Sequence, residues 1–124
     1  MVGVITVKLS KGDHLNHMAV ELSSLGLSQL LRFRHHGQFS DLESAISNQQ
    51  KAVELTDDGH PDKPTYLSQL GTSQRNRFVH RGDLADIENA IVNQQKAVEL
   101  TDDGNPNKPM YLSNLGNSQE NRFK

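Results

Sequence analysis

The stretch QQKAVELTDDG fills residues 49–59 and returns letter for letter at residues 94–104, an offset of 45. Sliding residues 25–79 onto 70–124 by this offset gives 37 identities in 55 pairs without a gap. The dipeptide Leu-Gly also occurs three times at this spacing, at residues 25–26, 70–71 and 115–116. Because self-similarity at a fixed period of roughly 20–50 residues is typical of stacked repeats, we expect about two and a half copies of one unit.

The second part of each unit has the apolar spacing of a helix. Residues three and four positions apart form one stripe in each unit: Phe39, Leu42, Ile46, Gln49 and Val53, then Leu84, Ile87, Ile91, Gln94 and Val98. Alanines beside these stripes are small enough to let a neighbouring helix come close. Ser40 and Asp83 are predicted to cap the helix starts, and Gly59 and Gly104 to end the helices with a positive φ. The pattern predicts helices over residues 39–56 and 84–101.

The first part of each unit also has the features of a helix, opened by Pro64 or Pro109. Between Leu70 and Phe78 this helix is polar, so its stability must come from packing against its neighbours. First helices are expected over residues 18–36, 64–81 and 109–123.

These helices define the expected organisation, an all-α solenoid of antiparallel helix pairs. Complete repeats are predicted at residues 18–62 and 63–107. Residues 108–124 are expected to be the first helix of a further repeat, acting as a C-terminal cap. Residues 1–17 are expected to be an N-terminal tail or a degenerate partial repeat. The apolar alternation over residues 2–9 suits a strand with nothing obvious to pair with, so an extended tail is expected there.

Composition narrows the classes of function. Only 34% of the residues are hydrophobic and the formal net charge is −2, without the basic excess that a nucleic-acid binder carries. No apolar run approaches the roughly 20 residues of a membrane-spanning helix. The chain has no cysteine, which fits a reducing compartment. We therefore expect an intracellular, cytoplasmic protein that binds neither nucleic acid nor membrane.

Several residues point to a known family. Leu67, Leu70 and Gly71, followed by Ala90 and the stretch KAVEL at residues 96–100, resemble the motif of the tetratricopeptide repeat, TPR. Relative to that family's unit, residues are added in both helices, in steps close to one helical turn that keep the apolar faces in register. The chain is most similar to a long-repeat subclass, with units of 45 residues, that is common in large fungal proteins. The resemblance covers residues 18–124.

This resemblance implies a scaffold for protein–protein interaction, in which the first helices line a concave groove that holds a partner peptide or helix. The groove positions carried over from the family are Ser23, Leu27, Leu30, Leu31, Ser68, Thr72, Arg75, Asn76, Ser113, Asn117, Glu120 and Asn121. The family's clamp for a peptide C-terminus needs Lys and Asn at central positions. Ser68 and Thr72 stand there in this chain, which argues against that type of ligand.

The alternative function is structural: a spacer, or a self-associating fragment of a longer repeat array. Two and a half units fall below the usual minimum of about three for a stable stack. The first helix is apolar on more than one face, through Leu22, Leu25, Leu27, Leu30 and Leu31. Such a surplus needs cover, which another copy of the chain could provide, so a homo-oligomer is a second expectation.

The other motifs favour structural interpretations. Arg81-Gly82-Asp83 spells the integrin-binding tripeptide, but His-Gly-Gln at residues 36–38 holds the same place one unit earlier, which favours a turn. His14 and His17 could share a helical turn, and loop acids suggest calcium: Asp57, Asp58 and Asp62, with His60. Neither set has the ligand number or spacing of a zinc or calcium site. We expect no metal site, no cofactor and no enzyme activity.

Two groups of side chains leave alternatives open. Arginines gather late in the first helices: Arg32, Arg75, Arg77, Arg81 and Arg122. They pair with acids of the adjacent second helix, or Arg75 faces the groove and favours an acidic ligand. The pairs Gln49-Gln50 and Gln94-Gln95 lie on or near the apolar stripes, and they either form a hydrogen-bonded ladder between repeats or are partly exposed.

Overall fold

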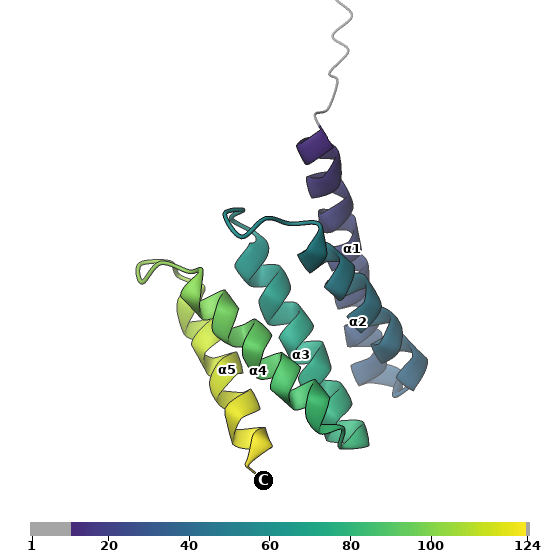
Figure 1. The fold of residues 1–124 in the computed structure, drawn as a ribbon. Coiled ribbons are helices and arrows are strands. Elements are labelled where there is room, and N and C mark those ends of the chain that lie inside the picture. The colour runs from purple at the N-terminus through teal and green to yellow at the C-terminus, as the bar shows by residue number, and fades with distance from the viewer. Residues whose placement is uncertain (1–10, 124) are drawn as a thin grey trace, which may run out of the picture.

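The computed structural model describes residues 11–123 and folds them into five α-helices without a strand in that range. The helices are α1 (Lys11–His36), α2 (Phe39–Glu54), α3 (Lys63–Arg81), α4 (Leu84–Glu99) and α5 (Lys108–Arg122) (Figure 1). The prediction of an all-α chain is confirmed. None of these five helices is both long and apolar enough to cross a membrane. The strand or extended tail considered for residues 2–9 lies outside the described residues.

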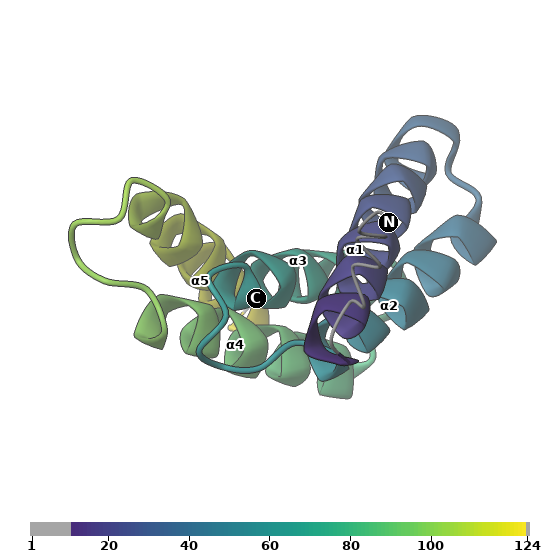
Figure 2. The same ribbon diagram turned by 90° about the horizontal axis from the view of Figure 1, so that it is seen from above.

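The helices pack mainly against their neighbours in the chain. α1 packs against α2 and α3 against α4, each pair joined by a short turn, and α2 packs against α3 and α4 against α5. Figure 2 shows α3 between α1 and α5, with α2 and α4 on one side of that row. The first helices of the units therefore share one face of the molecule, which positions the candidate site.

The core lies between the packed helices, within each pair and between pairs, and is rich in alanine. The fully buried residues of α2 and α4 include Leu42, Ala45, Ala52, Ile87, Ala90 and Ala97. Two residues of the stripe predicted for α4 are not in the core, since Leu84 is exposed and Val98 is only partly buried. The buried face of α4 is therefore rotated relative to the predicted stripe. The alanines face inward because their small side chains let the backbones of adjacent helices approach.

The glycines with positive φ lie in other turns than predicted. Gly37 and Gly82 have φ of 74°, in the tight turns within each helix pair. Gly59 and Gly104 do not have positive φ, so that prediction was wrong. The carbonyls at the end of α2 are instead satisfied by Lys63, whose Nζ donates to Val53 O at 2.8 Å and to Thr56 O at 2.5 Å. A lysine that reaches back removes the need for a left-handed glycine at this helix end.

Of the two predicted N-caps, one is confirmed and the other was wrong. The Asp83 side chain caps α4 by accepting a hydrogen bond from the Ala85 N–H at 3.0 Å, which confirms that cap. α2 is different, because its N-cap is Gln38 and Ser40 lies inside the first turn of the helix. The cap expected at Ser40 was therefore wrong.

α1 begins at Lys11, seven residues before the expected start at residue 18. Residues 11–17, expected to belong to a tail or a degenerate repeat, are its first turns. By the 45-residue offset, residues 13–19 correspond to 58–64, where Gly59 and Pro61 lie in the loop between α2 and α3 and Pro64 lies in the first turn of α3. The corresponding residues near the start of α1 are His14, Asn16 and Ala19, and none of them interrupts a helix.

Candidate functional site

A hollow of about 280 Å³ opens where the three first helices meet. Its lining comes from α1, α3 and α5: Leu27, Leu30, Arg34, Thr65, Ser68, Gln69, Thr72, Met110, Tyr111 and Asn114. Leu27 and Met110 are exposed apolar side chains of α1 and α5, whereas Leu30 and Ser68 are buried. The lining thus combines apolar side chains, polar side chains and the cation of Arg34.

Hydrogen bonds between successive first helices fix the width of the hollow. Ser23 Oγ donates to Gln69 Oε1 at 2.8 Å, and one unit later Asn114 Nδ2 donates to Ser68 Oγ at 3.0 Å. Both bonds join residues 46 apart, so α3 contacts α1 and α5 in the same register. Thr65 Oγ1 and the Tyr111 hydroxyl add a third such bond, at 2.7 Å.

Four of the groove positions carried over from the family line this hollow: Leu27, Leu30, Ser68 and Thr72. Further along the helices, Arg75 Nε donates to Asn121 Oδ1 at 2.6 Å, and Asn76 Nδ2 donates to Thr72 O at 2.7 Å. The remaining positions are exposed and lie outside the lining: Leu31, Ser113, Asn117 and Glu120. Ser23 is buried in its bond to Gln69.

Sequence reasoning did not find the other lining residues: Arg34, Thr65, Gln69, Met110, Tyr111 and Asn114. A signal for most of them lies in the comparison of the units. Residues 65 and 110 are Thr and Met, and residues 27, 72 and 117 are Leu, Thr and Asn, whereas the core residues are mostly identical between units. Positions that differ between otherwise identical units are free of the packing that the units share.

The other arginines are engaged in the fold. Arg77 Nε and one terminal nitrogen donate to the buried Asp86 carboxylate at 2.9 and 2.8 Å, and the other donates to Glu43 at 2.7 Å. These contacts, chiefly the hydrogen bonds to Asp86, raise the pKa of Arg77. Arg32 pairs with Asp41 at 3.5 Å and Arg122 with Glu88 at 4.0 Å. For Arg32, Arg77 and Arg122 the structure favours pairing with acids of second helices.

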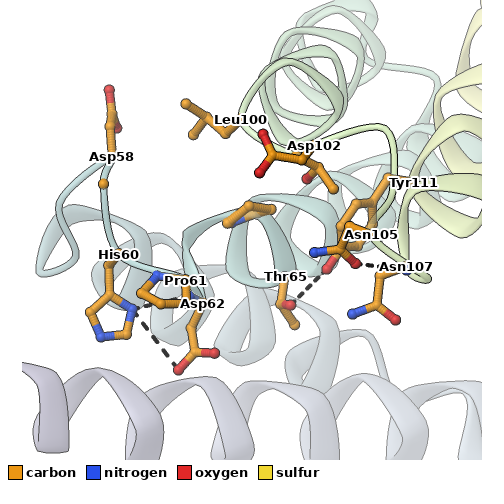
Figure 3. A pocket seen from close by; sticks show the side chains of 13 residues that line it. Asp58, His60, Pro61, Asp62, Thr65, Leu100, Asp102, Asn105, Asn107 and Tyr111 are labelled. Atoms are coloured by element: carbon orange, nitrogen blue, oxygen red, sulfur yellow. Dashed lines mark hydrogen bonds and ion pairs between the residues drawn. The ribbon is translucent and has the colours of Figure 1, made fainter.

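A second hollow, of about 390 Å³, lies between the α2–α3 and α4–α5 loops (Figure 3). Asp58, one of its acidic side chains, pairs with Lys96 at 3.1 Å and with Lys63 at 3.5 Å. The hydrogen bond from Lys96, helped by Lys63, lowers the pKa of Asp58. His60 Nδ1 accepts a hydrogen bond from the Asp62 N–H at 3.0 Å. Within residues 11–123, no three His, Asp or Glu side chains are grouped to hold a metal ion.

The Arg-Gly-Asp tripeptide forms the turn between α3 and α4. Gly82 takes the left-handed conformation that ends α3, and Asp83 caps α4. The Arg81 guanidinium lies 3.8 Å from the centre of the Phe39 ring, in a cation–π contact. All three residues therefore have roles in the fold, and the turn interpretation is confirmed.

Gln49 and Gln94 are buried, and their amides find no hydrogen-bond partner among the described residues. Gln50 is partly buried and Gln95 is exposed, whereas for Gln49 and Gln94 both interpretations, a ladder between repeats and partial exposure, were wrong. Each side chain instead packs on the glycine of a Leu-Gly pair: a Cβ on Gly26 would lie 2.6 Å from Gln49 Cγ, and one on Gly71 2.5 Å from Gln94 Cγ. The glycines make room for the glutamines.

The two complete units share hydrogen bonds as well as sequence. Asn48 donates to Gln29, and Asn93 to Gln74, both at 2.8 Å. Thr56 and Thr101 each donate to the carbonyl four residues back, at 2.7 and 2.6 Å. The units are thus near copies of each other in three dimensions. Beyond this internal likeness, the chain matches no family model, no curated protein and no solved structure.

Proposed function

We propose that this chain is a binding scaffold of the tetratricopeptide type, an α-solenoid rather than an enzyme. A peptide segment of a partner protein occupies the face formed by α1, α3 and α5. The hollow between these helices supports the proposal most directly, because three separate repeats contribute to it. Its lining is also richest in the positions at which the units differ.

The lining defines the chemistry of the peptide. Leu27, Leu30 and Met110 offer an apolar surface for one large aliphatic or aromatic side chain. Arg34, an exposed residue of the lining, favours a carboxylate nearby. The polar lining residues Gln69, Tyr111 and Asn114 make hydrogen bonds within the protein, so they shape the hollow without needing a ligand. The preferred peptide therefore has an apolar anchor next to an acidic residue.

Selection from a displayed library of random peptides tests the proposal. We expect enriched peptides to carry the apolar–acidic pair, and their affinity to fall at least tenfold in Leu27→Asp. The matched control is Val92→Asp, since Val92 is an exposed apolar residue of α4 and does not line the hollow. Arg34→Glu should switch the selected residue from acidic to basic. Equal affinity for the Leu27 and Val92 variants would contradict a binding site on this face.

Self-association is the second candidate, and the outer face of α1 favours it. A hollow of about 440 Å³ lies there, lined by Met18, Glu21, Leu22, Leu25, Asn48 and Lys51. Leu25 is 48% exposed, whereas its counterpart Leu70 is 0% exposed beneath the neighbouring helices. Sedimentation should then show a concentration-dependent dimer that Leu25→Lys dissociates. A monomer at all concentrations would rule this candidate out.

A further inference from the structure

The first helix of every unit carries the same stripe of four residues. Leucine, glycine, glutamine and phenylalanine follow at steps of four, three and four: Leu22, Gly26, Gln29 and Phe33; Leu67, Gly71, Gln74 and Phe78; Leu112, Gly116, Gln119 and Phe123. At about 3.6 residues per turn, such residues share one face of a helix. The stripe is thus present on α1, on α3 and at α5.

On α1 and α3 the stripe is covered by the next helix through matching contacts. Gln49 of α2 packs on Gly26, and Gln94 of α4 packs on Gly71. Three residues after each glycine, the glutamine of the stripe accepts a hydrogen bond from the covering helix. Gln29 of α1 accepts from Asn48, and Gln74 of α3 accepts from Asn93, both at 2.8 Å. The covering helix therefore presents an adjacent Asn-Gln pair to the stripe.

An ion pair at equivalent positions joins the start of each covering helix to the helix that carries the stripe. Arg32 of α1 lies 3.5 Å from Asp41 of α2, and Arg77 of α3 lies 2.8 Å from Asp86 of α4. In each covering helix the aspartate lies in the first turn and the Asn-Gln pair follows about two turns later. Their order runs opposite to that of the stripe, so the two helices are antiparallel.

At α5 the same stripe is open. Leu112 is 49% exposed, whereas Leu67 is 2% exposed, and Phe123 is 82% exposed. Gln119 is exposed, and a Cβ on Gly116 would meet nothing within 4 Å. α5 packs against α4 through a different face, on which Tyr111, Leu115 and Ser118 are buried. The stripe therefore has its binding residues but no covering helix among the described residues.

We propose that the stripe at α5 binds an amphipathic helix of the α4 pattern, presented in trans by a partner protein. The bound helix runs antiparallel to α5. Its glutamine packs on Gly116, the preceding asparagine bonds to Gln119, and an aspartate of its first turn pairs with Arg122. This surface is separate from the proposed groove, whose lining on α5 is Met110, Tyr111 and Asn114.

The probe is a fluorescently labelled synthetic peptide with the sequence of residues 83–101, titrated with the full chain and followed by anisotropy. We expect saturable one-to-one binding, with the peptide becoming helical. Gly116→Val should lower the affinity at least tenfold, because the new side chain occupies the space of the glutamine. Val92→Asp, at an exposed residue of α4 outside both the groove and the stripe, should leave it unchanged. Circular dichroism checks that both variants fold.

A charge exchange tests the register. The peptide with Asp86→Lys should bind several-fold more weakly, and Arg122→Asp in the protein should restore part of the loss. Absence of binding up to about 1 mM peptide would overturn the proposal. Equal binding to Gly116→Val would overturn it too, because it would show the peptide replacing the resident α4 on α3 or binding elsewhere.

Discussion

Truncation of Leu70 to alanine is expected to lower the free energy of unfolding by about 2–5 kcal/mol, the range for a fully buried leucine. Leu70 lies in the middle of α3 and is 0% exposed. Alanine loses the burial of the side chain and leaves a cavity that the surrounding helices can fill only in part. Urea denaturation followed by far-UV circular dichroism measures the loss, and a change below about 1 kcal/mol would contradict the packing described for α3.

The repeat provides a matched control for this experiment. Leu25 occupies the same place on α1, yet it is 48% exposed because none of the helices α2 to α5 covers that side. Leu25→Ala should change the free energy of unfolding by no more than about 0.5 kcal/mol in dilute solution. A loss as large as that of Leu70→Ala would show that the outer face of α1 is covered in solution.

Replacement of Gly71 by valine is expected to destabilise the protein by about 2–3 kcal/mol through overpacking. A Cβ at this position would lie 2.5 Å from Gln94 Cγ and 2.9 Å from its Cδ. Gln94 is buried, so its side chain cannot turn away without displacing other core atoms. The midpoint of thermal or urea unfolding reports the effect.

Gly116→Val is the control, because the equivalent space on α5 is open. Its free energy of unfolding should lie within about 0.5 kcal/mol of that of the unsubstituted protein. Adding Gln94→Ala to Gly71→Val should recover much of the loss, since it removes the atoms that the valine meets. Purely additive effects of the two substitutions would contradict the close contact between Gly71 and Gln94.

Much of the fold could be predicted from the repeat itself. The helices α2 to α5 begin and end within two residues of their predicted bounds, because proline and glycine mark their limits in both units. α1 was predicted too short, since its extra turns have no counterpart in the later units. The end of α2 depends on Lys63, a residue of the next helix, and such a contact has no local signal in the sequence.

The candidate site was predicted in part. Leu27, Leu30, Ser68 and Thr72 were placed by resemblance, and they line the hollow. Arg34 and Met110 were missed, because which side chains meet across three helices depends on how the helices are tilted. Burial of Gln49 and Gln94 without a hydrogen-bond partner was not predicted, because an unpaired buried amide costs free energy and is rare in proteins.

The similarity of the helix pairs has a consequence for how the chain reaches its native state. Most contacts join helices that follow one another, so little loop-closure entropy opposes them, and low contact order favours rapid formation of each hairpin. The same similarity gives Gly26 two equivalent glutamines, Gln49 of α2 and Gln94 of α4. Packing of α4 on α1 would therefore make the same contacts with the stripe of α1. Such misassembly is characteristic of repeat proteins. Because the turn at Gly37 is short, we expect α2 to reach α1 before α4 does, which favours the native pair.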